Sequence, residues 1–402
     1  MERRQHVLPR SGNAEIQTKN TAIGNLRTYV TLLVVFHHSL LAYVQYAHFD
    51  RRYYLWSTAP IVDKDRWLGF DLLVDFNDIY FMSLMFFISG VFVIPSLIRR
   101  GPWNYLSSRI VRLGIPFVIA VTVLMPIAYY PSYLQTGSAL SFPQYWMGYF
   151  SSYGWPAGPA WFIWVLLLFD SLIVLMVLRW PAVVQQLIAI PNWLMSRPLT
   201  GLALFTAIAL GAYLPTLYAF GPAHWISRGP FAVQASRLFL YITFFVAGAA
   251  LGSAGAAHPI LEKAGPFARS WAVPAIAGLV AFSALVSIQI AALRQASFSS
   301  NPIWFAVTAF LFVVACSSIS IAFFGGFIRY FDRKRKWADL LASCAFGIYL
   351  VHYVVLTWVQ TALLKINEPA AIKAGVAFVA TVSVSWIAVA FLRKHGSLRL
   401  IF

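Results

Sequence analysis

The sequence has few charged residues and very few cysteines. Only 11% of its 402 residues are charged, whereas 60% are hydrophobic, and this composition excludes a soluble globular domain. The two cysteines, Cys316 and Cys344, lie inside apolar runs and have neither a CxxC motif nor a Cys/His spacing of the metal-binding kind. The sequence therefore supports neither a disulfide framework nor a zinc site, and we expect no metal.

Acidic residues are the scarcer charged class, with 13 Asp and Glu against 30 Lys and Arg and a net charge of +17. Such an excess suits nucleic acid or a membrane surface. The basic residues lie in short loops beside the apolar runs, which is the pattern of the positive-inside rule. We therefore expect the lipid bilayer as a partner and no nucleic acid. The polar segment 1–20 lacks the apolar core of a cleaved signal peptide, so the first span is expected to act as the signal.

Long apolar runs make up most of the chain. Ten of them reach about 19 residues, enough to cross ~30 Å of hydrocarbon as a helix, and the alternating strands of an outer-membrane barrel are absent. The predicted fold class is all-α, a polytopic integral membrane protein with about ten transmembrane helices. The expected spans are 27–47, 77–98, 111–130, 161–180, 200–220, 234–253, 271–292, 302–324, 340–364 and 371–392.

The distribution of Lys and Arg orients these spans. An even number of spans places both termini on one side, and 21 of the 30 basic residues lie in the termini and the even-numbered loops. The positive-inside rule then predicts that both termini are cytoplasmic. The expected parts are a cytoplasmic segment 1–26, a ten-helix membrane domain 27–392 and a cytoplasmic tail 393–402.

The first span carries two adjacent histidines. Eleven steps of ~100° bring His38 to within ~20° of the direction of Arg27, and the rise is about 16 Å. Arg27 should therefore lie at the membrane edge and His38 near the midplane on the same face, while His37 points ~80° away. An ionisable group at that depth usually marks function. The alternative is a histidine whose hydrogen bonds are satisfied by a neighbouring helix.

Arg109 and Arg112 lie near the start of the third span, in SSRIVRLGIPF. Two guanidinium groups three residues apart share a helix face and suit a phosphate or pyrophosphate. Alternatively, they fix topology and contact lipid headgroups. With Arg27 on the same side, they predict an anion site below a buried histidine. Coenzyme A thioesters fit that arrangement, with phosphates in the cytoplasm and a reactive end that a neutral imidazole can serve as a base.

Six segments carry a resemblance to a known family: Arg27 with ten residues and then His38, FNDIYFMSLMFFISGVF (76–92), RIVRLGIP (109–116), PAWFIWVLLLF (159–169), LYITFFVAGAALG (240–252) and CAFGIYLVHY (344–353). Through them the chain resembles the acyltransferase 3 family of integral membrane acyltransferases, and within it the glucan biosynthesis protein C type, a glucan succinyltransferase. The resemblance implies acyl-CoA as the donor substrate, bound by Arg27, Arg109 and Arg112, with His38 as the essential histidine. It also implies a carbohydrate acceptor and a bacterial inner membrane location. His37 is an extra histidine relative to this pattern.

Further polar residues lie within or beside the spans. His352, in the ninth span, is expected near mid-depth and is either a second catalytic histidine or a packed core residue. Asp170 is the only acid deep within a span, and it either orients a histidine or serves as a structural partner. Asn77, Asp78 and Arg237 lie near the outer ends of their spans and are candidates for acceptor binding.

Three stretches outside these candidates also have expected roles. The second outer loop, 131–160, has no charged residue and many aromatics, which predicts an interfacial belt or a stacking platform for sugar rings. The basic run 333–336 fixes topology or supplements the phosphate site, while Arg99 and Arg100 are expected at the inner boundary, outside that site. Gly248, Gly252 and Gly255, in GAALGSAG, predict close helix packing rather than a nucleotide loop.

The predicted function is O-acyl transfer of an acetyl- or succinyl-class group from cytoplasmic acyl-CoA to a carbohydrate hydroxyl at or beyond the membrane. His38 acts either as a general base or as a nucleophile. The alternative function is a transporter or flippase for a polar glycan precursor, in which the buried His and Asp residues relay protons. The hydropathy profile lacks both an inverted repeat and a pair of broken helices, which argues against a transporter.

Overall fold

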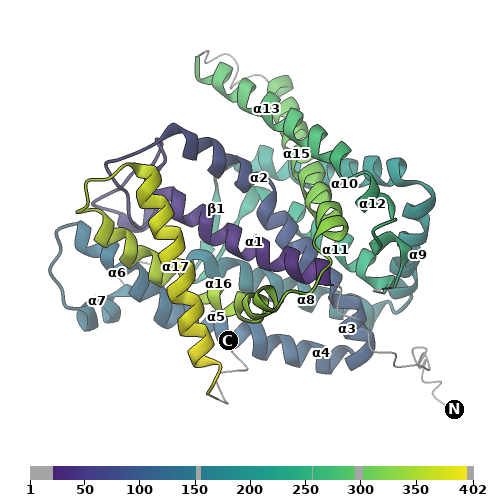
Figure 1. Ribbon diagram of the computed structural model, residues 1–402, viewed down its shortest axis with the longest axis horizontal. Coiled ribbons are helices and arrows are strands. Elements are labelled where there is room, and N and C mark those ends of the chain that lie inside the picture. Colours follow the sequence, from purple (N-terminus) through teal and green to yellow (C-terminus); the bar gives the residue numbers. More distant parts are fainter. Residues whose placement is uncertain (1–20, 151–154, 256, 295–301, 396–402) are drawn as a thin grey trace.

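The computed structural model describes residues 21–150, 155–255, 257–294 and 302–395 (Figure 1). Helices make up nearly all regular structure in these residues, which confirms the all-α prediction. The helices are α1 (Thr21–Leu40), α2 (Leu68–Val91), α3 (Val93–Arg100), α4 (Pro102–Arg109), α5 (Ile115–Ile119), α6 (Met125–Gln135), α7 (Phe142–Tyr149), α8 (Trp161–Arg179), α9 (Ala182–Ser196), α10 (Pro198–Phe220), α11 (Leu238–Ser253), α12 (Pro266–Arg269), α13 (Ala272–Arg294), α15 (Pro302–Tyr330), α16 (Lys336–Leu363) and α17 (Ala370–Leu392).

Short turns and one hairpin complete the described structure. The hairpin pairs β1 with β2 in antiparallel register, Trp225 opposite Gln234 and Arg228 opposite Phe231. The bounds are β1 (Trp225–Arg228) and β2 (Phe231–Gln234), the 3-10 turns η1 (Leu41–Tyr43), η2 (Tyr54–Trp56), η5 (Gly158–Ala160), η6 (Ala235–Arg237) and η7 (Pro259–Leu261), and the π-helical turns η3 (Ile110–Gly114) and η4 (Ala120–Leu124).

Nine helical segments of the described chain are long and apolar enough to cross a membrane: Leu68–Arg100, Pro102–Gln135, Gly158–Arg179, Pro198–Phe220, Ala235–Ser253, Ala272–Ala292, Pro302–Tyr330, Ala338–Leu363 and Ala370–Leu392. The remaining predicted span, 27–47, corresponds to α1, which begins and ends about seven residues earlier, at Thr21 and Leu40, and is not in this set. Its 20 residues are about 30 Å long, enough for a span, but Asn25, Arg27 and the histidine pair make it too polar. The protein is therefore a polytopic membrane protein, and the cytoplasmic location of both termini stays a prediction.

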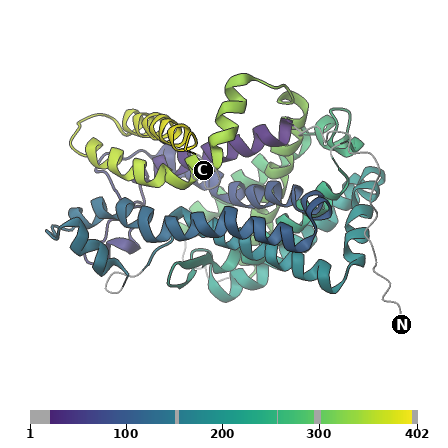
Figure 2. The ribbon, with the colours of Figure 1, turned by 90° about the horizontal axis from the view of Figure 1, so that it is seen from below.

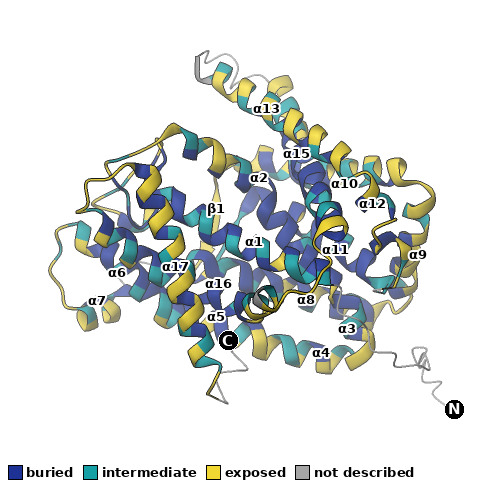
Figure 3. Ribbon diagram, in the orientation of Figure 1, coloured by how far each residue is buried: buried dark blue, intermediate teal, exposed yellow. Residues whose placement is uncertain are grey.

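The polar helix α1 lies inside the bundle. It packs against α2, α15, α16 and α17, and Figure 1 shows it crossing the middle of the molecule. Figure 3 shows α1, α2 and α11 mostly buried, whereas α13 and α17 expose much of their surface. Neighbouring helices thus shield α1 from lipid, as the cost of exposing its polar groups to hydrocarbon requires.

The segment from α4 to α6 forms one long rod (Figure 2). Two π-helical turns, η3 and η4, interrupt it, and each is followed within two residues by a proline, Pro116 and Pro126. Proline donates no backbone hydrogen bond and its ring crowds the preceding turn, so a widened turn relieves the clash. Arg112 lies in the first widened turn and not in the regular helix that the sequence predicts.

Glycines let α2 and α11 approach closely. A Cβ atom on Gly248 would lie 2.0 Å from the backbone oxygen of Phe87, and one on Gly252 would lie 1.9 Å from that of Val91. Gly90 makes the reciprocal approach to Phe245 from α2. These contacts confirm the prediction of small-residue packing for Gly248 and Gly252. The prediction is wrong for Gly255, which follows the end of α11 with a φ of 81° and where a Cβ atom would meet nothing within 4 Å.

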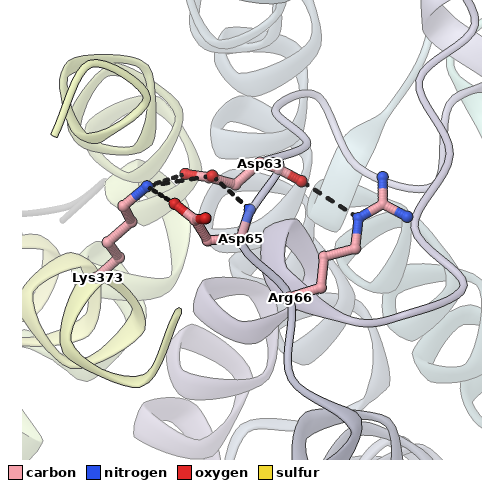
Figure 4. Close-up of polar contacts among 4 residues, drawn as sticks. All are labelled: Asp63, Asp65, Arg66 and Lys373. Atoms are coloured by element: carbon pink, nitrogen blue, oxygen red, sulfur yellow. Dashed lines mark hydrogen bonds and ion pairs between the residues drawn. The ribbon is translucent and has the colours of Figure 1, made fainter. Parts of the chain in front are cut away.

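A buried ion cluster fastens segment 44–67 to the start of α17 (Figure 4). The Nζ atom of Lys373 lies 3.0 Å from the carboxylate of Asp63 and 2.7 Å from that of Asp65, and the lysine side chain is fully buried. A buried ammonium group needs such partners because it has lost its hydration. The hydrogen bond from Lys373 lowers the pKa of Asp65. The cluster joins regions about 310 residues apart in sequence.

Replacing Gly248 with Ala should destabilise the protein by about 1–3 kcal/mol, because the added methyl group overpacks the α2–α11 contact. A lower midpoint of thermal unfolding in detergent would measure this loss. The matched control is Gly211→Ala in α10, where a Cβ atom meets nothing within 4 Å. Equal midpoints for the two variants would contradict the packing argument.

Candidate functional site

A cavity of about 690 Å³ lies among α1, α2, α3, α8 and α16. Among the described residues its lining contains no acid and no lysine, but it has five arginines: Arg27, Arg99, Arg100, Arg109 and Arg112. The three arginines that the sequence predicts for an anion site therefore meet at one cavity, which we call the arginine cavity. Five guanidinium groups suit a ligand with several negative charges. The run 333–336 is exposed before and at the start of α16, and none of its residues lines the cavity.

Arg99 and Arg100 line this cavity, although the sequence analysis expects them outside the anion site. They end α3, and Gly101, with a φ of 77°, reverses the chain into α4. The Nη1 atom of Arg100 donates a hydrogen bond of 2.8 Å to Ser108 on α4. Because the chain reverses at this turn, the last residues of α3 and the last residue of α4 both line the arginine cavity. Spacing in the sequence does not reveal this reversal.

Asp170 holds Arg109 and does not contact a histidine. Its carboxylate is fully buried on α8 and accepts a hydrogen bond of 2.5 Å from Nε of Arg109 and one of 2.6 Å from the hydroxyl of Tyr105. The expectation that Asp170 orients a histidine therefore differs from the observed contacts. The ion pair engages Arg109 through its Nε atom. Tyr105 is a residue that the sequence analysis missed, although it lies one helical turn before Arg109.

The cavity leads toward a pair of histidines along two helices. The helices α1 and α16 pack side by side. In each helix a residue that lines the cavity, Arg27 or Ser343, precedes in sequence the histidine that joins the pair, His38 or His352. The two helices therefore run in the same direction. Tyr349 lines the cavity only three residues before His352, and Thr31 lines it seven residues, or ~10 Å, before His38.

His38 and His352 form a hydrogen-bonded pair. Nδ1 of His352 lies 2.6 Å from the backbone oxygen of Tyr349, and its Nε2 lies 3.3 Å from Nδ1 of His38. A carbonyl oxygen only accepts, so in neutral rings Nδ1 of His352 carries the hydrogen and its Nε2 accepts from Nδ1 of His38. Nε2 of His38 then has the free lone pair of a base. His352 is fully buried, and its carbonyl contact fixes the tautomers of both rings.

His37 faces a different helix, as the helical phase predicts. Its ring stacks on Phe81 of α2 with centroids 4.9 Å apart, whereas the ring of His38 packs on Tyr353 of α16 at 5.3 Å. The Nδ1 atom of His37 is buried and has no hydrogen-bond partner among the described residues. The two adjacent histidines therefore contact different parts of the bundle.

Buried tyrosines lie beyond the histidine pair. Tyr353 contacts Tyr129, and both belong to an apolar cluster that includes Tyr133, Tyr145 and Tyr149. Three of these side chains come from segment 131–160, where the sequence predicts either an interfacial belt or a sugar platform. They are packed inside the protein, so part of this aromatic content is core.

Replacing Asp170 with Asn should weaken binding of coenzyme A about tenfold, because Arg109 loses the charged hydrogen bond that holds it. Isothermal titration with coenzyme A measures this loss. Tyr105→Phe removes one bond to Asp170 but leaves the ion pair, so its loss should be smaller. If Asp170→Asn instead lowers kcat with binding unchanged, the carboxylate serves the histidines and our placement is wrong.

The chain matches the family described as acyltransferase domain (Acyl_transf_3) over residues 20–390. This range runs from the start of α1 nearly to the end of α17, and it contains both histidines and all five cavity arginines. No curated protein and no solved structure matches the chain. The protein is therefore a membrane acyltransferase that belongs to the acyltransferase 3 family.

Proposed function

We propose that this protein transfers an acyl group of the acetyl or succinyl class from cytoplasmic acyl-CoA to a hydroxyl of a carbohydrate. The acceptor lies at the membrane or on its periplasmic side, and the membrane is a bacterial inner membrane. The observation that carries the proposal is the arginine cavity, whose end at Tyr349 lies one helical turn from His352 and its partner His38. A polyanion site thus adjoins a histidine base. The resemblance to glucan biosynthesis protein C makes a glucan the first acceptor to test.

The donor is proposed to bind with its phosphates among the five arginines. Planar guanidinium groups bind phosphate through paired hydrogen bonds, and Asp170 holds the one on Arg109 in place. The pantetheine arm then extends along α1 toward His38, about 16 Å above Arg27 by helical rise. In this proposed pose the thioester lies at the histidine pair and the nucleotide at the cytoplasmic end.

The transfer step needs one base and one returning proton. Nε2 of His38 takes the proton of the acceptor hydroxyl as the oxygen attacks the thioester carbonyl. The tetrahedral intermediate collapses, the carbon–sulfur bond breaks, and the thiolate of coenzyme A takes the proton from His38. His352 accepts the hydrogen bond from Nδ1 of His38 throughout and stabilises the imidazolium, a role comparable to that of the third residue in a triad.

A relay through an acyl-histidine uses the same residues in two steps. Nε2 of His38 attacks the thioester carbonyl, the carbon–sulfur bond breaks and coenzyme A leaves as a thiolate. The acceptor oxygen then attacks the acyl carbon, the carbon–nitrogen bond to the ring breaks, and the hydroxyl proton passes to the thiolate. Incubation with labelled acyl-CoA in the absence of acceptor distinguishes the routes. A labelled, hydroxylamine-sensitive adduct on His38 supports the relay, and its absence supports direct attack.

The function is tested by incubating purified protein in nanodiscs with labelled acetyl-CoA or succinyl-CoA and glucan oligosaccharides. Wild-type protein should form acylated sugar. The double variant Arg109→Ala, Arg112→Ala should bind acyl-CoA at least about tenfold more weakly, because two charged hydrogen-bond donors are lost.

Lys at both positions should rescue binding only partly, because lysine does not bind phosphate in a bidentate manner. The matched control is Arg179→Ala, Arg197→Ala, which removes two exposed arginines that do not line the cavity. Full binding in the cavity variant, or equal loss in the control, would overturn the donor assignment.

The histidines should separate by role. His38→Ala should lower transfer at least ~100-fold, the usual effect of removing a general base, while acyl-CoA still binds. His352→Ala should lower kcat less, because the base remains but loses its orienting partner. His37→Ala should retain more transfer than His38→Ala, because its ring faces α2. An inactive His37→Ala beside an active His38→Ala would refute this assignment of roles.

A further inference from the structure

A second charged cluster lies on the opposite side of the histidines from the arginine cavity. Nη2 of Arg237 is 2.6 Å from the carboxylate of Asp78, and its Nη1 is 3.0 Å from the backbone oxygen of the same residue. Along α2, Asp78 precedes Phe81, which contacts His37, and Phe81 precedes Met85, which lines the arginine cavity. The helix thus passes from Asp78 through the level of the histidines to the cavity.

The two members of this pair differ in exposure. Arg237 is buried, with 7% of its surface exposed, and its guanidinium lies 4.9 Å from the ring of Phe312. The side chain of Asp78, in contrast, is 43% exposed. The arginine therefore fixes one carboxylate oxygen, while the Asp78 side chain remains partly exposed. A charged arginine buried within a membrane bundle usually has a functional reason.

Two more carboxylates lie on the same stripe of α2. Asp71, Asp75 and Asp78 are four and three residues apart, so they share one helix face. Burial, followed by the charges of Asp75, Asp78 and Asp71, raises the pKa of Tyr46, so this phenol lies within electrostatic reach of all three. We call Asp71, Asp75 and Asp78 the carboxylate face.

His37 supplies an independent sign of a ligand. It is buried, its Nδ1 atom has no partner among the described residues, and it lies within electrostatic reach of both Asp78 and Arg237. Its ring centroid is 5.6 Å from that of His38. A buried ring nitrogen without a partner is costly unless a hydroxyl or water completes it. A hydroxyl bound between Asp78 and His37 would lie beside the proposed base.

We propose that the carboxylate face, with Arg237 and His37, binds the acceptor, and that this acceptor is a neutral sugar or an amino sugar and not a uronic acid. Carboxylates accept hydrogen bonds from sugar hydroxyls and attract an ammonium group, but they repel another carboxylate. The negative charge of the carboxylate face also repels the polyanionic donor, which is attracted to the positively charged arginine cavity. This inference rests on the proposed acyl transfer.

The test uses the full-length protein in nanodiscs with labelled acetyl-CoA and one of three probes, glucose, glucosamine or glucuronic acid. Release of coenzyme A without sugar measures hydrolysis, and acylated sugar measures transfer. The wild-type protein should acylate glucose and glucosamine at least about tenfold faster than glucuronic acid, the effect of a net repulsion of about 1.4 kcal/mol. Asp75→Asn should lower the ratio of these acylation rates, because it removes one of the carboxylates that repel glucuronic acid.

A charge swap separates acceptor binding from a structural role. Asp78→Arg combined with Arg237→Asp keeps an ion pair between α2 and η6, so the unfolding midpoint should recover relative to Asp78→Asn alone. The swap moves the carboxylate from position 78 on α2 to the buried position 237. The ratio of transfer to hydrolysis should therefore still fall at least about tenfold. The matched control is Asp332→Asn, which removes the distant partner of Lys263 and should leave this ratio unchanged.

Each outcome decides the inference. Full recovery of transfer in the swapped variant makes the pair structural and overturns the proposal. A preference for glucuronic acid, or hydrolysis of acetyl-CoA without acylation of any sugar, also overturns it while leaving a functioning donor site. If the swapped variant does not fold, an unchanged sugar preference in Asp75→Asn overturns the proposal instead. Failure to bind or consume acyl-CoA overturns the proposed function itself, and the inference with it.

Discussion

Polar groups inside a bilayer must find their partners within the protein, and this constraint arranges the whole bundle. The helix α1 carries an arginine and two histidines in a length that just crosses the hydrocarbon. It is therefore enclosed by α2, α15, α16 and α17, which also supply the partners of its side chains. The apolar helices at the edge, such as α13 and α17, expose much of their surface instead. The two histidines of α1 accordingly lie within the bundle, His37 buried and His38 partly buried.

The same constraint explains how charge is distributed within the protein. Arg109 and Arg237 both lie inside the bundle, and each is held by one carboxylate from another helix, Asp170 or Asp78. A buried guanidinium without such a partner would cost several kcal/mol. In both pairs the carboxylate fixes the arginine, and one partner remains partly exposed. This partner is Arg109 in the first pair and Asp78 in the second. The ion pairs thus hold both arginines in fixed positions within the bundle.

Close backbone contact supports this arrangement. The glycines of α2 and α11 bring the two helices together over a long interface, and prolines with π-helical turns reshape the segment from α4 to α6. These features set where the ends of the helices meet. The arginine cavity exists because α3 and α4 reverse at Gly101 beside the first turns of α1 and α16. Its five arginines come from three separate parts of the sequence.

The sequence by itself determined the all-α membrane class, the face of α1 that carries Arg27 and His38, and the close packing around Gly248. Each of these follows from local periodicity or composition, which the chain carries in any environment. The tertiary structure alone decided that His352 pairs with His38, that Asp170 serves Arg109, and that Arg99 and Arg100 join the cavity. These outcomes depend on which helices become neighbours. The helical period of one segment contains no information about the side chains of another segment hundreds of residues away.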